Sequence, residues 1–250
     1  MQLSTIPFLI AGLFGFVAWL ALRAERQRAI TRRQRLATWG VLAVLSVWAV
    51  LSAHLASSGT YLAPGLLDWM PGLWLPLVPF AIVGIAVAIS HDFRHALVGI
   101  LDVTPPQWLV YVQAVRITAI GTLVKTMQGT FPLHFELGVG LPDLLFGLSA
   151  LWIAWAVLRG AIGWRGLVYW NLAGFAVVAV PALLLTQMGL PGPMQVFEGP
   201  PASEALLVYP MALAPTVIVP FFLMLNLWAA TWLFLRRPAT GSDASVSARA

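Results

Sequence analysis

Long apolar runs separated by short polar segments are the dominant pattern of this chain. Seven runs of roughly 17 to 25 residues are each long enough to cross the hydrocarbon of a membrane as an α-helix. Lipid offers the backbone no hydrogen-bond partner, so each run should be helical. The strict alternation of apolar and polar residues that marks a membrane β-barrel is missing. The expected spans lie near residues 5–22, 38–57, 73–90, 107–127, 141–158, 167–187 and 211–235.

The distribution of basic residues tests this count of seven. The first, third and fifth connections and the C-terminal tail hold twelve of the 14 Lys and Arg residues, whereas the connections near 58–72, 128–140 and 188–210 hold none. Basic loops stay in the cytoplasm, which predicts the N-terminus outside and the C-terminus in the cytoplasm. Arg23 and Arg26 follow the first apolar run, so we expect that run to be retained as a span and not cleaved as a signal peptide.

Composition supports a membrane protein and narrows its partners. Hydrophobic residues make up 60% of the chain and charged residues 9%, against about 25% charged in soluble domains. The net charge of +5 could suggest nucleic acid, but the position of the arginines between spans identifies them as topology signals. The sequence predicts an all-α polytopic bundle of the inner membrane, with residues 1–237 as one domain and 238–250 as a disordered cytoplasmic tail. Expected partners are membrane lipids and other membrane subunits, without nucleic acid.

The fourth apolar run carries unusual polar residues. Arg116 lies near its middle, where an arginine costs about 2.5 to 3.5 kcal/mol on insertion scales and usually faces protein or water. Gln113 precedes it by one turn on the same face, and Lys125 lies on a different face, close to the outer end. A central arginine needs an acidic partner, and we find no Asp or Glu central to any predicted run.

The nearest acids in sequence belong to the connection before the fifth run. Glu136 lies in an apolar segment broken by Gly and Pro, which predicts a re-entrant loop that carries Glu136 toward Arg116. Asp143, just inside the fifth run, suits the positive end of its helix dipole. These residues could tie helices together, form an outward-opening pocket or belong to a proton or ion path. The predicted ligand-binding set is Gln113, Arg116, Lys125, His134, Glu136 and Asp143.

The four histidines suggest two weaker hypotheses. His91 and His95 are spaced to present two imidazoles on one helix face to a metal, but no third ligand is evident. His54 and His134 belong to the outer half and could ligate a haem axially, although His134 is expected in a loop. We therefore expect no cofactor, with haem as the alternative, and the metal is unknown, with His91, His95 and His54 as weak candidate ligands.

Common catalytic motifs are missing from the sequence. We find no phosphate-binding glycine loop, no GxSxG elbow and no HExxH helix. The last span has no lysine to form a retinal Schiff base, and the chain has no cysteine. The favoured hypothesis is therefore a membrane protein without enzymatic activity that binds or moves a small solute or lipid head group. The alternatives are a structural or assembly subunit of a respiratory or photosynthetic complex, and a haem-carrying subunit.

One segment resembles a pattern in uncharacterised bacterial multi-pass inner-membrane proteins. There, a Q-x-x-R helix precedes G-x-L-P-x-x-F and then a G-x-x-D-x-x-x-G-L stretch. The resemblance covers about a sixth of the chain and, since that family has no known activity, implies a site without a reaction. The matching residues are Gln113, Arg116, Gly129, Pro132, Phe135, Gly140, Asp143, Gly147 and Leu148.

Overall fold

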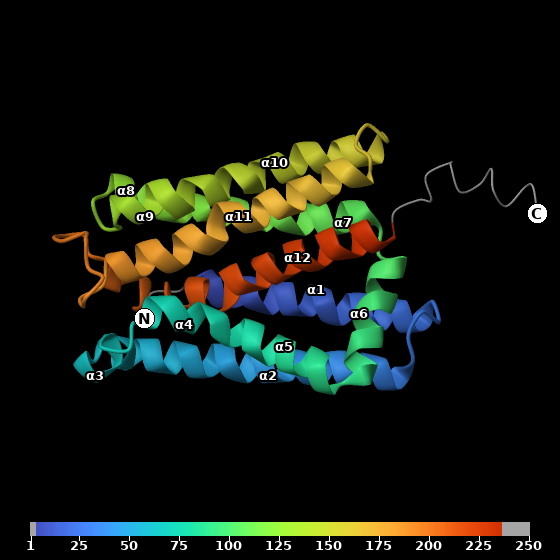
Figure 1. Ribbon diagram of the computed structural model, residues 1–250, viewed down its shortest axis with the longest axis horizontal. Helices are drawn as coiled ribbons and strands as arrows, with labels where there is room; N and C mark the ends of the chain where they lie inside the picture. The colour runs from blue at the N-terminus through green and yellow to red at the C-terminus, as the bar shows by residue number, and fades with distance from the viewer. Residues whose placement is uncertain (1–3, 237–250) are drawn as a thin grey trace, which may run out of the picture.

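The computed structural model describes residues 4–236, and every regular element among them is helical. Six helical stretches are long and apolar enough to cross a membrane, and they run side by side as a bundle (Figure 1). This arrangement confirms a multi-pass helical membrane protein. The predicted tail, 238–250, lies outside the described residues. The six stretches are Ile6–Arg26, Arg32–Ser57, Pro71–Ile89, Leu133–Leu158, Trp164–Met188 and Ala214–Leu235.

Three of these stretches are single α-helices, and three join shorter pieces end to end. The single helices are α1 (Ile6–Arg26), α2 (Arg32–Ser57) and α11 (Trp164–Met188). The composite stretches are α4 (Pro71–Trp74), η2 (Leu75–Leu77) and α5 (Val78–Ile89), then α9 (Leu133–Phe135), η4 (Glu136–Gly140) and α10 (Leu141–Leu158), and finally η6 (Ala214–Ile218) and α12 (Val219–Leu235). The connections between stretches contain η1 (Thr60–Leu62), α3 (Pro64–Leu67), α6 (His91–Val103) and η5 (Ser203–Leu206).

The fourth predicted run is helical throughout but changes its helix type. It consists of α7 (Pro106–Tyr111), the 3₁₀-helix η3 (Val112–Ala119) and α8 (Ile120–Met127). Eight residues of 3₁₀-helix are unusual, because runs longer than three or four residues are uncommon. This run is not among the six stretches that are long and apolar enough to cross a membrane, so a seventh crossing stays a prediction.

The predicted re-entrant loop is wrong. Residues 133–140 are helical and continue directly into α10, so the stretch begins at Leu133 and not near 141. The Gly and Pro residues that suggested a loop are accommodated by η4, a π-helical turn that ends two residues before Pro142. A proline ring clashes with the carbonyl four residues earlier, and local π-helix is one way to relieve this clash. The π-helical turn η6 likewise ends two residues before Pro220.

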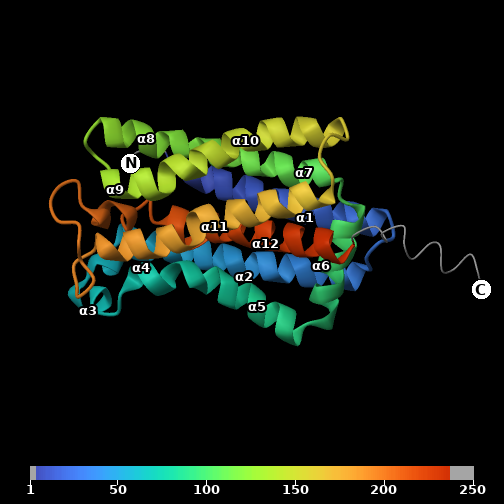
Figure 2. The same cartoon turned by 45° about the horizontal axis from the view of Figure 1, so that its top comes forward.

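The two ends of the bundle differ in charge. The connection after α1, the loop after α10 and the end of α12 lie at one end, where most of the arginines of the described chain are found (Figures 1 and 2). The helix α6 runs across this end of the bundle (Figure 1). An ion pair joins it to the last helix, where Arg236 Nη2 donates to Asp102 Oδ2 at 2.5 Å. The start of α1, α3 and the loop after α11 lie at the opposite end.

The main helix–helix contact joins α11 to α12 in the middle of the bundle. On one side of this pair, α10 packs against α7 and η3. On the other side, α1 packs against α2, α6 and η6. The face of α1 turned toward α7 and η3 therefore has no closely packed helix, and this gap borders the site described next.

Candidate functional site

A buried ion pair forms the centre of the polar cluster. Nε of Arg116, in η3, donates to Oδ1 of Asp143 in α10 at 2.5 Å, and Nη2 lies 2.5 Å from the same oxygen and completes the ion pair. The Arg116 side chain is 1% exposed and that of Asp143 is 18% exposed. The carboxylate, with its second oxygen Oδ2, is therefore the partly accessible member of the pair.

Helix geometry brings these two groups to the same depth. Since α10 is preceded by the helical residues 133–140, Asp143 lies about 15 Å inside a continuous helical stretch at 1.5 Å per residue. It is not at a helix N-terminus, so the predicted dipole argument does not apply. The expectation that no span has a central acid is also wrong, because it placed the start of this helix too late.

A second layer of hydrogen bonds surrounds the guanidinium. Arg116 Nη1 donates to Gln113 Oε1 at 3.4 Å, and Gln113 Nε2 donates to Asn226 Oδ1 at 2.8 Å. In a 3₁₀-helix, residues three apart eclipse one another, which places Gln113 directly above Arg116. Both terminal nitrogens also donate to the Gly174 carbonyl, at 3.4 and 3.3 Å. The cluster therefore joins four helices: η3, α10, α11 and α12.

Aromatic rings and glycines shape the space around Arg116. Its guanidinium carbon lies 4.5 Å from the ring centre of Phe146 and 5.7 Å from that of Phe222. A Cβ on Gly174 would lie 2.1 Å from the Phe146 ring, and a Cβ on Gly147 would lie 2.8 Å from the Ile117 backbone nitrogen. Both glycines are therefore needed for close approach around the charge. Cation–π contacts of this kind contribute about 2 kcal/mol when desolvated.

A cavity of about 410 Å³ opens beside the ion pair. Arg116 and Asp143 lie on its wall, and Lys125 lines it nine residues further along the same helical run. Thr118 and Thr122 also line it, and the remaining walls are mainly apolar. Among the described residues, the Lys125 ammonium makes no ion pair. We call this space the polar cavity.

Glu136 is buried beside the polar cavity but does not pair with Arg116. Its residue is 1% exposed, and neither carboxylate oxygen makes a hydrogen bond. The Thr122 hydroxyl lies near this carboxylate, but it donates its hydrogen bond to the Ala119 carbonyl at 2.8 Å. The carboxylate occupies the space that a Cβ on Gly140 would fill. The predicted approach of Glu136 to Arg116 is therefore wrong, because the helical backbone of residues 133–140 holds it a turn away.

The histidines lie apart from this cluster. His134 shares its hydrogen bond with the Ser203 hydroxyl at 2.9 Å and stacks on Phe197, and it does not line the polar cavity. The rings of His91 and His95 are 4.0 Å apart on the exposed start of α6. His54 is exposed near the end of α2. Within residues 4–236, no three His, Asp or Glu side chains gather as metal ligands.

Of the six predicted ligand-binding residues, the polar cavity brings together Arg116, Lys125 and Asp143. Gln113 lies behind Arg116, while Glu136 and His134 lie outside the cavity wall. A sequence family described as a domain of unknown function, DUF8737, matches residues 73–234, well over half of the chain. The chain belongs to the DUF8737 family. No curated protein and no solved structure matches it.

The DUF8737 match includes every residue of the polar cluster and excludes α1 and α2. Two parts of the chain therefore form the polar cavity. The ion pair and Lys125 belong to the region that matches the family, and one wall belongs to the segment before it, with Ser4, Thr5, Ile6 and Leu9. The function of this family is not established, so chemical arguments about the site depend on its geometry.

Sequence reasoning missed several members of the site. Asn226 is a polar residue within the last span, but nothing in the sequence pairs it with Gln113. Phe146 and Phe222 are indistinguishable from other apolar residues of their spans. Gly174 offered the only usable signal, because a glycine inside a helix often marks a close approach.

Proposed function

We propose that this protein is a seven-span inner-membrane protein that binds the anionic head group of a membrane amphiphile in the polar cavity. The proposed topology places the N-terminus outside and the basic end of the bundle in the cytoplasm, in accord with the positive-inside rule. The polar cavity then belongs to the outer half of the membrane.

The observation that carries this proposal is the charge arrangement along the helical run 106–127. Arg116 is neutralised by Asp143, whereas Lys125, near the end of the same run, faces the cavity without an acidic partner. The net charge of the cavity wall is therefore positive at its rim. A lysine close to the membrane surface attracts an anionic lipid head group by about 1 kcal/mol.

The deeper part of the polar cavity suits a neutral polar group. The guanidinium of Arg116 already donates to three acceptors, so it has little capacity for a ligand anion. Asp143, Thr118 and Thr122 line the cavity, and their side-chain oxygens can accept a hydrogen bond from a hydroxyl of the ligand. A head group with a phosphate and free hydroxyls, such as phosphatidylglycerol, matches both requirements.

Lipid retention measured by native mass spectrometry tests the proposal. Protein purified in an uncharged detergent is mixed with equal amounts of phosphatidylglycerol and phosphatidylcholine. We expect wild type to retain phosphatidylglycerol preferentially and Lys125→Gln to lose about fivefold in that preference, the equivalent of about 1 kcal/mol. Arg165→Gln, which removes a cation at the opposite end of the bundle, is the matched control. Equal retention of the two lipids by wild type would refute the proposal.

A further inference from the structure

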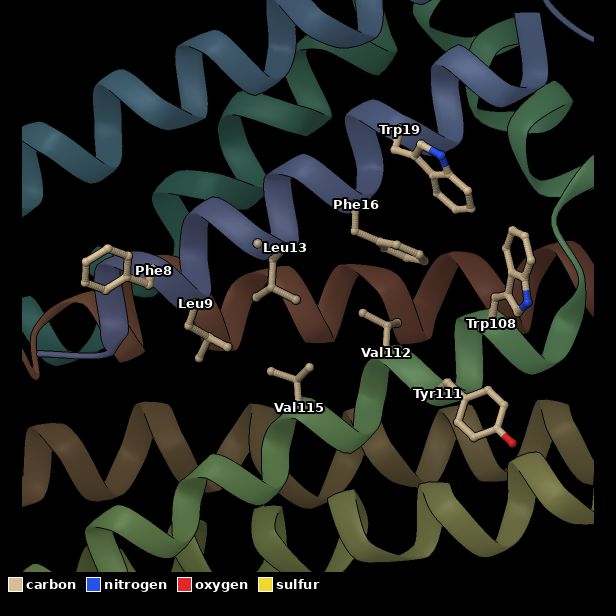
Figure 3. Close-up of a pocket in the computed structure, with 10 residues that line it drawn as sticks. Phe8, Leu9, Leu13, Phe16, Trp19, Trp108, Tyr111, Val112 and Val115 are labelled. Carbon is tan, nitrogen blue, oxygen red and sulfur yellow. The ribbon is translucent and has the colours of Figure 1, made fainter. Parts of the chain in front are cut away.

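A second cavity lies along the same two helices as the polar cavity. It has a volume of about 560 Å³ and lies between α1 and the segment formed by α7 and η3. Figure 3 shows its side chains converging from the two sides, with Leu9, Leu13 and Phe16 on α1 opposite Val112 and Val115. All its lining residues are apolar or aromatic: Phe8, Leu9, Gly12, Leu13, Phe16, Trp19, Trp108, Tyr111, Val112 and Val115. We call it the apolar seam.

The apolar seam and the polar cavity are neighbouring parts of one groove. Leu9 lines both of them. Along the facing run, positions 108, 111, 112 and 115 line the seam, and positions 116, 118, 119, 121, 122 and 125 line the polar cavity. The two sets follow one another directly along the same helical run. The groove therefore passes from a charged rim to a fully apolar channel.

The seam is closed at its far end. The rings of Trp19 and Trp108 meet there with their centres 5.2 Å apart. Arg23 covers Trp108, with its guanidinium carbon 4.7 Å from the ring centre, and donates to the Val103 carbonyl at 2.7 Å. The seam thus ends before the basic face of the bundle, while its other end joins the polar cavity.

Two features make the seam a space that a narrow chain can fill. Gly12 lies on its wall, and a Cβ at this position would meet no atom within 4 Å. Within residues 4–236, the principal contacts of α1 are with α2, α6 and η6, which are other elements than the α7 and η3 that face it across the seam. In a membrane, such an apolar space beside a positively charged pocket is surrounded by molecules that carry a hydrocarbon chain and an anionic head.

We propose that the apolar seam binds a hydrocarbon chain of the same anionic lipid whose head group occupies the polar cavity. This inference depends on the proposed function, and it identifies the ligand as a lipid bound along its length. The seam from Leu9 to Trp19 covers about 15 Å at the rise of an α-helix. In this orientation the phosphate lies beside Lys125, and the chain extends from Leu9 toward Trp19 and Trp108.

Substitutions that fill the seam test this assignment without touching the polar residues. Gly12→Leu adds a side chain into open space, and Val112→Phe fills the seam from the facing wall. Gly84→Leu is the matched control, because Gly84 is an exposed glycine of α5 that also has no atom within 4 Å of its Cβ position. Each variant is assayed for retention of phosphatidylglycerol by native mass spectrometry and for stabilisation by glycerol 3-phosphate, which lacks acyl chains.

We expect both seam-filling variants to lose at least tenfold in phosphatidylglycerol retention, while glycerol 3-phosphate raises their Tm as it does in wild type. Gly84→Leu should behave like wild type with both probes. If the filled variants keep the lipid at the wild-type level, the seam assignment is wrong and the head-group site stands. If wild type binds neither probe, the proposed function itself fails. If a seam variant releases a co-purified membrane subunit in place of lipid, the seam is a docking surface for a helix and our assignment is overturned.

Discussion

Replacing Asp143 by asparagine removes the charge that balances Arg116 while it keeps the size of the side chain. The guanidinium has a side-chain exposure of 1% and no other acid bonded to it. Its remaining partners, Gln113 and the Gly174 carbonyl, accept at 3.3 to 3.4 Å, which is long for a charged donor. We expect Asp143→Asn to lower the free energy of unfolding by about 3 to 5 kcal/mol, the range for a buried charge that loses its partner.

The reverse substitution should cost less. In Arg116→Gln, the stranded carboxylate of Asp143 is 18% exposed and borders the polar cavity, so solvent can reach it. We expect a loss of about 1 to 3 kcal/mol, close to that of an unsatisfied polar group. The double variant, which has neither charge, should be more stable than the sum of the two single losses predicts.

Unfolding by SDS in mixed micelles, followed by tryptophan fluorescence, measures all four proteins of this cycle. The reasoning requires two results: Asp143→Asn is the less stable single variant, and the coupling between the two sites exceeds about 0.5 kcal/mol. Equal losses for the single variants, or strictly additive losses, would refute the assignment of a fully buried cation paired with a partly accessible anion.

Two further predictions concern close packing and pH. Gly174→Ala should lower the free energy of unfolding by about 1 to 3 kcal/mol, because its Cβ would displace the Phe146 ring from beside the cation. Gly15→Ala, with open space at the Cβ position, is the control in the same assay and should leave the free energy of unfolding unchanged. Tyr61, between the spans, donates to Ser52 at 3.0 Å, and burial raises the pKa of its phenol. The folded state therefore holds this proton to a higher pH than the unfolded state does. The contribution of the Tyr61 hydroxyl to the free energy of unfolding is complete below about pH 10 and is lost as the pH rises through the raised pKa. Tyr61→Phe should be less stable than wild type by about 1 kcal/mol at pH 8. Thermal melts at increasing pH should show that this difference narrows above pH 10. A difference that stays constant would contradict a stabilising role for the protonated Tyr61 hydroxyl.

The spans could be predicted well from the sequence because their physical cause is local. A run of some twenty apolar residues has one stable backbone in lipid, and six such runs are helical stretches. The largest departure from the predicted limits is the start of the fifth run, at Leu133 and not near 141. The fourth run is where local reasoning stopped, since the change to 3₁₀-helix at Val112 depends on packing against α10 and not on composition.

The pairing within the site could be predicted only in part. The need of Arg116 for an acid follows from the cost of a buried charge, and Asp143 was one of two candidates. The choice between them depended on where the helix begins. Gly138, Gly140 and Pro142 favoured a loop by their local preferences, but the hydrogen-bond requirement of a backbone in lipid outweighed those preferences and extended the helix to Leu133. Asp143 was thereby placed beside Arg116, and Glu136 was left without a cation.

Phe8 and Tyr111, on the wall of the apolar seam, are exposed at the surface of the bundle, so the seam opens sideways toward the surrounding lipid. A groove that borders the hydrocarbon is filled from within the bilayer, so the quantity that governs binding is the mole fraction of the ligand among the surrounding lipids and not its molarity in water. Diluting the protein into more buffer would leave such a complex intact. Adding inert lipid or detergent at constant volume would empty it, because each added molecule competes for the space beside Gly12.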